Sequence, residues 1–92
     1  MEYLIIIENG ENNLSAYSPD VLGCVATGQT VEETLQNMKD ALSFHLEDLF
    51  YQSEPIPQPQ GIEKHLAEIN IHTDDLFTFL TIDFNSIMAK AA

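Results

Sequence analysis

The stretch TVEETLQNMKDALSFHLEDLFY, Thr30 to Tyr51, predicts the element around which the rest of the fold is arranged. Thr30 and Glu33 have the spacing of a capping box, in which a hydroxyl and a carboxylate satisfy free N–H groups at a helix start. Behind them, apolar residues recur at intervals of three and four, which is typical of a helix with one buried face. The residues of this predicted stripe are Val31, Leu35, Met38, Leu42, His45 or Leu46, and Leu49. We expect an amphipathic helix that ends near Tyr51.

Three short strands are predicted before this helix. Tyr3–Ile7 is a β-branched run without alternation, which is typical of a strand covered on both faces. Asn9–Asn13 contains residues that favour a turn, and Leu14–Ser18 alternates well enough to form a hairpin with the first strand. Cys24–Thr27 is a short third strand that stops at Gly28.

The chain after the helix is predicted to be extended and then to form a last strand. Three prolines within Glu54–Pro59 exclude a helix interior there. Ile62, Leu66 and Ile69 have the spacing of one or two helical turns, and Asn70–Asp75 is polar and turn-like. Leu76–Phe84 alternates between two partly apolar faces, which indicates a strand inside the sheet or at an interface.

These elements predict an α+β fold of the order β-β-β-α-β. We expect the helix to return the chain so that the last strand lies parallel beside the first, which gives a mixed sheet with the long helix on one face. The other face is then expected to be open, and its Ile and Phe side chains would form an exposed patch for a partner. Residues 1–85 are predicted to form the domain and residues 86–92 a frayed tail.

Composition excludes several classes of function. The 92 residues correspond to one small domain, and 15 Asp and Glu against 3 Lys give a net charge of −12. Without a basic patch the chain is not expected to bind nucleic acid or an anionic membrane. The acidic balance instead favours a basic partner. Cys24 is the single cysteine, and the start lacks a signal peptide, so a cytoplasmic location is expected.

No group of residues has the pattern of a catalytic or metal site, and no cofactor is expected. Glu8, Asp20 and Asp83 fall near strand ends, where carboxylates of metal-dependent nucleases converge, but the cations that would hold phosphates are absent. The three histidines, which are His45, His65 and His72, lack metal-binding spacing. Cys24 is expected to be a small buried residue rather than a nucleophile.

The segments Tyr17–Thr30 and Glu32–Leu42, followed by His45-Leu46-Glu47, resemble the characteristic motif of the HicB-like antitoxins. This motif combines a P-D-x-x-G-C turn, a small strand, a G-x-T helix entry, a helix of the E-E-A-x-x-N type and a later P-x-P. The residues of this chain that match it are Pro19, Asp20, Gly23, Cys24, Gly28, Thr30, Glu33, Asn37, Pro55 and Pro57. Val21-Leu22 departs from the Leu-Pro of many members, and a C-terminal DNA-binding domain is not evident, so autoregulation by this chain is not expected.

The resemblance implies a partial ribonuclease-H-like domain that is not a nuclease. It also implies a homodimer or tetramer that binds and neutralises a HicA-type toxin, which is a small basic ribonuclease that degrades messenger RNA. The acidic surface would steer the encounter with such a toxin. The expected contacts are Glu8, Glu11, Tyr17 and Asp20, around the turns after the first and second strands. Two alternatives stay open: an oligomeric scaffold without a toxin, and a vestigial metal-dependent nuclease.

Overall fold

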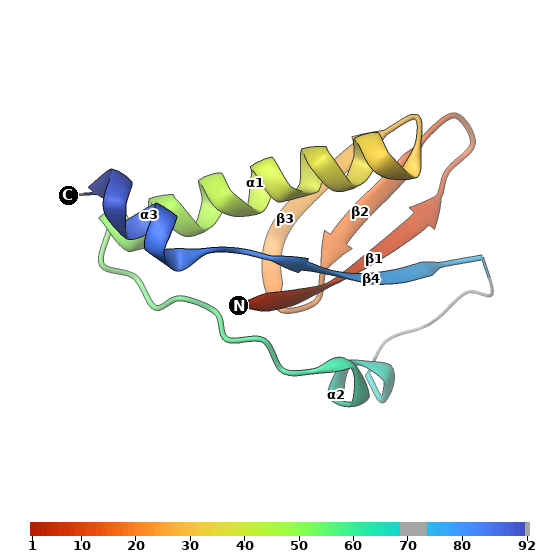
Figure 1. Cartoon of the computed structure of the whole chain (residues 1–92). Coiled ribbons are helices and arrows are strands. Elements are labelled where there is room, and N and C mark those ends of the chain that lie inside the picture. Colours follow the sequence, from red (N-terminus) through yellow and green to blue (C-terminus); the bar gives the residue numbers. More distant parts are fainter. Residues whose placement is uncertain (69–73, 92) are drawn as a thin grey trace.

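The computed structural model describes residues 1–68 and 74–91, and the side chains up to residue 89. Within them the chain forms four strands and three helices (Figure 1). In chain order these are β1 (Glu2–Asn9), β2 (Leu14–Ser18), β3 (Val21–Gly28), α1 (Val31–Tyr51), α2 (Ile62–Leu66), β4 (Leu76–Thr81) and α3 (Phe84–Ala91). The predicted Ile69, the turn at residues 70–73 and His72 lie outside the described residues. No helix in the described ranges combines the length and the apolar character that crossing a membrane requires.

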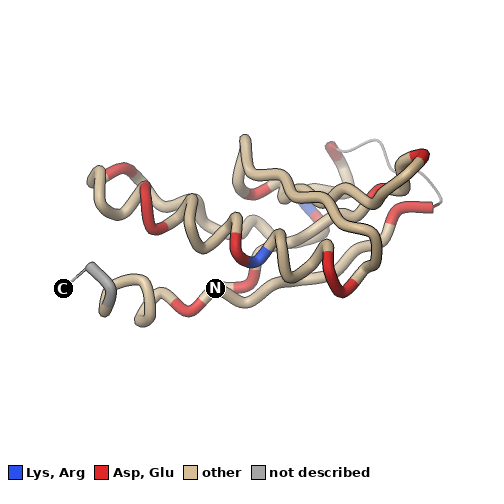
Figure 2. Tube along the Cα trace, turned by 90° about the horizontal axis from the view of Figure 1, so that it is seen from above, with Lys and Arg blue, Asp and Glu red and all other residues tan. Residues whose placement is uncertain are grey.

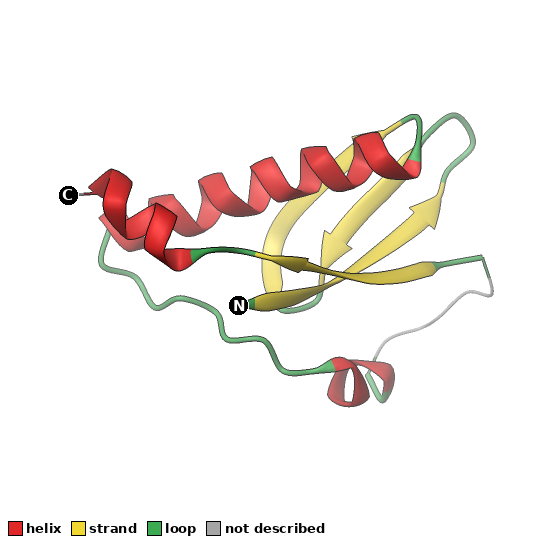
Figure 3. Ribbon diagram, viewed as in Figure 1, coloured by secondary structure: helices red, strands yellow, loops and turns green. Residues whose placement is uncertain are grey.

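The strands form one sheet in the order β3-β2-β1-β4, and α1 lies along one face of it (Figure 3). The β1–β2 hairpin is antiparallel, with Ile6 opposite Tyr17, as the turn residues after β1 predicted. An α+β fold with a long helix on one sheet face is thereby confirmed.

The predicted direction of the last strand is wrong. β4 pairs with β1 antiparallel, with Glu2 opposite Thr81 and Ile7 opposite Leu76, so the sheet is antiparallel throughout rather than mixed. The prediction counted only the return of the chain through α1. The proline-rich segment after α1 runs the length of the sheet once more, below it in Figure 1, so β4 enters from the opposite end.

The predicted frayed tail is also wrong within the described residues. β4 ends at Thr81, and Phe84, which was expected to extend it, begins helix α3. Asp83 caps this helix, since its carboxylate accepts hydrogen bonds from the Asn85 N–H at 2.9 Å and from the Ser86 hydroxyl at 3.3 Å. Ile87 is buried against the core, so α3 closes the end of the sheet beside the C-terminal end of α1.

Helix α1 begins with the predicted cap. The Thr30 hydroxyl accepts a hydrogen bond from the Glu33 N–H at 3.1 Å, while the Glu33 carboxylate accepts one from the Gln29 N–H at 3.4 Å. The Asn37 side chain donates to the Thr27 carbonyl at 2.8 Å, which ties the helix to the end of β3. Three of the family-motif positions therefore fix where the helix starts and how it meets the sheet.

The core lies between α1 and the sheet. Its largest members are the inward side chains of β1 and the buried stripe of α1, which are Tyr3, Ile5, Ile7, Met38, Leu42 and Leu46. The predicted stripe is correct in its centre but not at its start. Val31 is 40% exposed, and the adjoining buried position is Thr34, whose hydroxyl donates to the Thr30 carbonyl at 2.7 Å. A threonine can be buried there because its hydroxyl is satisfied within the first turn.

Candidate functional site

The turn between β2 and β3 holds a buried carboxylate, Asp20, whose side chain is 1% exposed. One oxygen accepts a hydrogen bond from the Leu4 N–H of β1 at 3.2 Å. The other accepts from the Gln60 N–H at 2.8 Å and lies 2.6 Å from Nε2 of His65 in α2. Asp20 therefore connects the turn to β1, to the proline-rich segment and to α2.

His65 is a residue whose role the sequence does not reveal. It lies 45 positions after Asp20, in a helix of five residues, and has no metal-binding spacing. Only weak sequence features indicate this role. His65 lies beside Leu66 in a short amphipathic helical segment, and an acidic residue, Asp20, lies in the turn of the family motif. His65 is 6% exposed, so the pair holds α2 against the sheet from inside the protein.

Tyr3 makes a second link to the proline-rich segment. Its hydroxyl donates to the Pro57 carbonyl at 2.8 Å, and its side chain is fully buried. Burial raises the pKa of the Tyr3 hydroxyl, and the negative charge of Asp20 raises it further. The P-x-P part of the family motif, Pro55 to Pro57, thus lies where its backbone receives a hydrogen bond from β1.

The free energy of unfolding is expected to fall as the pH rises above about 10, where a tyrosine of the unfolded chain loses its proton. The raised pKa means that the folded state keeps the Tyr3 proton when the unfolded state has already lost it, so the stabilisation is present below that pH and is lost above it. Urea unfolding at a series of pH values measures this. In Tyr3→Phe the alkaline decline should be shallower, and parallel curves for the two proteins would contradict the assignment.

The outer face of the sheet, on the side away from α1, carries a row of apolar residues across all four strands. Val25, Tyr17, Ile6 and Phe77 are successive partners in the ladder, and Leu4 is opposite Phe79 in the next row. These six residues form the outer face. Direct partners in antiparallel strands project to the same side, so the row is continuous.

The outer face is only partly open, which corrects the expectation of an uncovered face. Ile6 and Leu4 are at most 1% exposed, whereas Val25 is 59% and Phe79 is 45% exposed. Helix α2 lies on this side of the sheet, opposite α1 (Figure 1). The exposed apolar surface is therefore concentrated at the two edge strands, β3 and β4, rather than spread over the centre.

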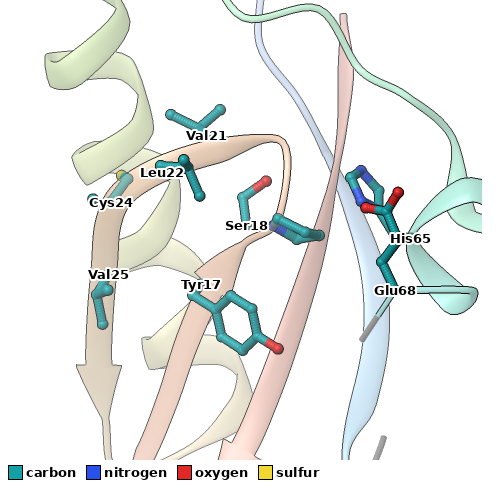
Figure 4. Close-up of a pocket in the computed structure, with 10 residues that line it drawn as sticks. Tyr17, Ser18, Val21, Leu22, Cys24, Val25, His65 and Glu68 are labelled. Carbon is teal, nitrogen blue, oxygen red and sulfur yellow. The ribbon is translucent and has the colours of Figure 1, made fainter. Parts of the chain in front are cut away.

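A hollow of about 440 Å³ lies between the β2–β3 hairpin and α2. Tyr17, Ser18 and most residues of the P-D-x-x-G-C turn form one wall, and His65 of α2 and Glu68 just after it face them (Figure 4). Leu22, which is 85% exposed, stands at its rim. Gly23 has a φ of 82° here, and Cys24 behind it is buried, which raises the pKa of its thiol. The prediction that Cys24 is a buried residue is confirmed.

Two of the four predicted contact residues are brought together. Glu8 follows Ile6 by two positions on the same side of β1, beside Tyr17 of β2. Burial raises the pKa of the Tyr17 hydroxyl, and the negative charges of Glu8 and Asp75 raise it further. Glu11 is exposed in the following turn. Glu8, which is opposite Ser15, and Glu11 lie at the far end of β2 from Asp20, which is buried in its own turn.

The carboxylates of the nuclease hypothesis are not brought together. Asp83 follows Ile82, whose N–H bonds to the Met1 carbonyl at the start of β1, whereas Glu8 lies at the other end of that strand. At about 3.3 Å per residue these two positions are more than about 20 Å apart. Among the described residues, no three Asp, Glu, His or Cys side chains are placed to share a metal ion.

Acidic positions are spread over helices, loops and strand ends with few lysines between them (Figure 2). Lys64 bonds to the Gln60 side chain at 2.9 Å. The surface is thus available to a basic partner at several places.

Comparison with other sequences identifies relatives along the whole chain. A protein of the Haemophilus phage HP1 rep-hol intergenic region, of 14.9 kDa and uncharacterised, is 33% identical over 91 residues, which cover 99% of this chain and 68% of the phage protein. A UPF0150 protein of Synechocystis is 30% identical over 66 residues, which cover 71% of this chain and 84% of that protein.

Comparison with solved structures gives the same fold. The Burkholderia pseudomallei antitoxin HicB aligns with a TM-score of 0.78 at 19% identity over 92% of this chain, which spans 65% of the HicB chain. A chain from the HicA3 and HicB3 toxin–antitoxin complex aligns with a TM-score of 0.69 at 27% identity, covering 90% of this chain and 99% of that one.

The family model of the HicB-like antitoxins of bacterial toxin–antitoxin systems matches residues 3–92. That range includes the Asp20 turn, the capped helix and the proline-rich segment described above. The chain therefore belongs to the HicB-like antitoxin family.

Proposed function

We propose that this protein binds and neutralises a small basic toxin of the HicA type in the cytoplasm, without catalysing a reaction. The observation that carries the proposal is the acidic strand end at Glu8 and Glu11 on the same sheet as the exposed Val25 of the β3 edge, with the half-buried Tyr17 of β2 between them. A basic protein meets opposite charge there, and apolar side chains are available for burial once it docks.

The comparisons support the choice of partner. A chain that is 27% identical over 90% of this one belongs to a solved HicA3 and HicB3 toxin–antitoxin complex. We propose that inhibition is steric: the acidic edge covers the RNA-binding surface of the toxin. Glu8, Glu11 and Tyr17 would contact the toxin directly, whereas Asp20 would act by holding the β2–β3 turn in place.

A dimer or tetramer is proposed as well. β4 is the sheet edge on the opposite side from β3, and its exposed Phe79 favours pairing with a second copy. A scaffold that only self-associates is the remaining alternative, and the mass in solution with and without the toxin separates the two.

Co-expression tests the proposal. A small basic reading frame adjacent to this gene is the candidate toxin to look for; it is expressed alone and together with this chain, and growth and messenger-RNA cleavage are measured. We expect growth arrest with the toxin alone and rescue by this chain. Val25→Lys should weaken toxin binding by at least about tenfold, since it places a cation at the edge that meets a basic partner.

Val31→Lys is the matched control, because it makes the same change at a position of α1 that is 40% exposed and lies on the other layer. Circular dichroism confirms that both variants are folded. The proposal would be refuted if the adjacent gene encodes a toxin that this chain neither binds nor neutralises. Equal losses of toxin affinity in the two variants would show that the toxin contact is not at the β3 edge.

A further inference from the structure

The C-terminal half of α1 carries an aromatic and acidic patch on the side away from the sheet. It consists of Phe44, Glu47, Asp48 and Tyr51, which line a small hollow of about 130 Å³. Their spacing of three, four and seven residues places them on one helix face, opposite the buried Leu42 and Leu46. Phe44 is 76% and Tyr51 is 56% exposed, so two rings lie on the face that a helix ordinarily fills with polar residues.

The charges of the patch are at the unfavourable end of the helix. The last turn of a helix has a partial negative charge and is stabilised by cations. α1, which is described throughout, has no basic residue in its last turn, and Glu47 and Asp48 add negative charge close to it. Both carboxylate oxygens of Asp48 accept hydrogen bonds from the Gln52 side chain, at 3.1 and 3.0 Å, which fixes the carboxylate beside Tyr51. The Asp48 carboxylate thus lies on the same helix face as the exposed rings of Phe44 and Tyr51.

We propose that this patch is a second binding site, which takes an arginine side chain of a basic protein partner. A guanidinium is planar, stacks on aromatic rings and donates paired hydrogen bonds to carboxylates, so it satisfies both features of the patch at once. The hollow is smaller than the roughly 300 Å³ typical of small-molecule sites, and it fits one side chain. A second copy of this chain is a poor occupant, because its own patch would bring two more carboxylates against Glu47 and Asp48.

The site is separate from the outer face, since α1 and the outer face lie on opposite sides of the sheet (Figure 1). It goes beyond the proposed function and can be tested without any toxin. The probes are two short peptides of equal length and charge, Gly-Arg-Gly-Arg-Gly and Gly-Lys-Gly-Lys-Gly, titrated into the full ¹⁵N-labelled chain. Chemical shift changes should be concentrated at residues 44–51, and the arginine peptide should bind about threefold more tightly than the lysine peptide.

Two pairs of variants separate the patch from general attraction to an acidic protein. Phe44→Ser should remove the preference for arginine, whereas Leu22→Ser, at another strongly exposed apolar position, should keep it. Asp48→Asn should weaken binding more than Asp40→Asn. The two aspartates lie on the same helix, and each accepts a hydrogen bond from a glutamine four residues away, so the loss of charge is matched.

Shift changes spread over the whole surface, or equal binding of the two peptides, would overturn the proposal. So would a fall in solution mass on Phe44→Ser, because the patch would then be a contact between copies. If the adjacent toxin fails to bind while the arginine peptide still binds at residues 44–51, the proposed function fails and the site stands. The converse result removes the site and leaves the toxin proposal intact.

Discussion

Replacing Asp20 by alanine is expected to lower the free energy of unfolding by about 3–5 kcal/mol, because each buried donor that loses its acceptor costs about 1–3 kcal/mol. The substitution deprives three groups of their acceptor: the Leu4 N–H, the Gln60 N–H and Nε2 of His65. Because the Asp20 side chain is 1% exposed, water cannot replace these bonds without opening the turn. Urea unfolding followed by circular dichroism measures the loss.

Two further measurements keep this prediction testable if Asp20→Ala folds poorly. Asp20→Asn keeps one acceptor oxygen and should cost less than alanine. Limited proteolysis should cut the segment of residues 52–68 earlier in either variant, since Asp20 holds both Gln60 and His65. Asp40→Ala, on the exposed side of α1, is the control and should change stability by less than about 0.5 kcal/mol. A similar small effect of Asp20→Ala would refute the role assigned to its carboxylate.

Gly28→Ala is expected to destabilise the protein by about 1–3 kcal/mol through overpacking. A β-carbon at this position would lie 2.5 Å from the Thr34 hydroxyl, 2.7 Å from its backbone nitrogen and 2.9 Å from its α-carbon. Two of these atoms belong to the helix backbone, and Thr34 is held by bonds from its N–H and its hydroxyl to the Thr30 carbonyl. The start of α1 must therefore move away from β3.

Gly23→Ala is the matched comparison. Gly23 has a φ of 82° but no atom within 4 Å of an added β-carbon, so its cost is limited to backbone strain of about 1–2 kcal/mol. The two variants should also differ in which amide signals of the NMR spectrum change. Gly28→Ala should disturb amide signals at the first turn of α1, whereas Gly23→Ala should leave them unchanged. Undisturbed signals around Thr34 in Gly28→Ala would contradict the predicted clash.

Local patterns were sufficient to predict the elements that depend on neighbours in sequence. The cap at Thr30, the buried Met38 and Leu42, and the β1–β2 hairpin follow from spacings of a few residues, because helix and strand periods repeat over that range. Two residues of the family motif, Asp20 and Asn37, make hydrogen bonds that join the β2–β3 turn to β1 and helix α1 to β3.

Features that depend on the path of the backbone between distant elements were not predicted. The direction of β4 depends on whether the proline-rich segment crosses the sheet once more, and its composition sets only that it is extended. The helix at Phe84–Ala91 was missed because its single buried anchor, Ile87, has meaning only where the end of α1 offers a surface to pack on.

The family, the acidic character and the long helix on a sheet follow from the amino-acid sequence alone, because these are properties of composition and short spacing. The packing of distant segments places the Asp20 side chain inside the fold, paired with a histidine 45 positions away, and brings Glu8 close to Tyr17. A carboxylate carries the same charge in either setting. Whether it meets solvent or buried N–H donors depends on which distant segments pack over it.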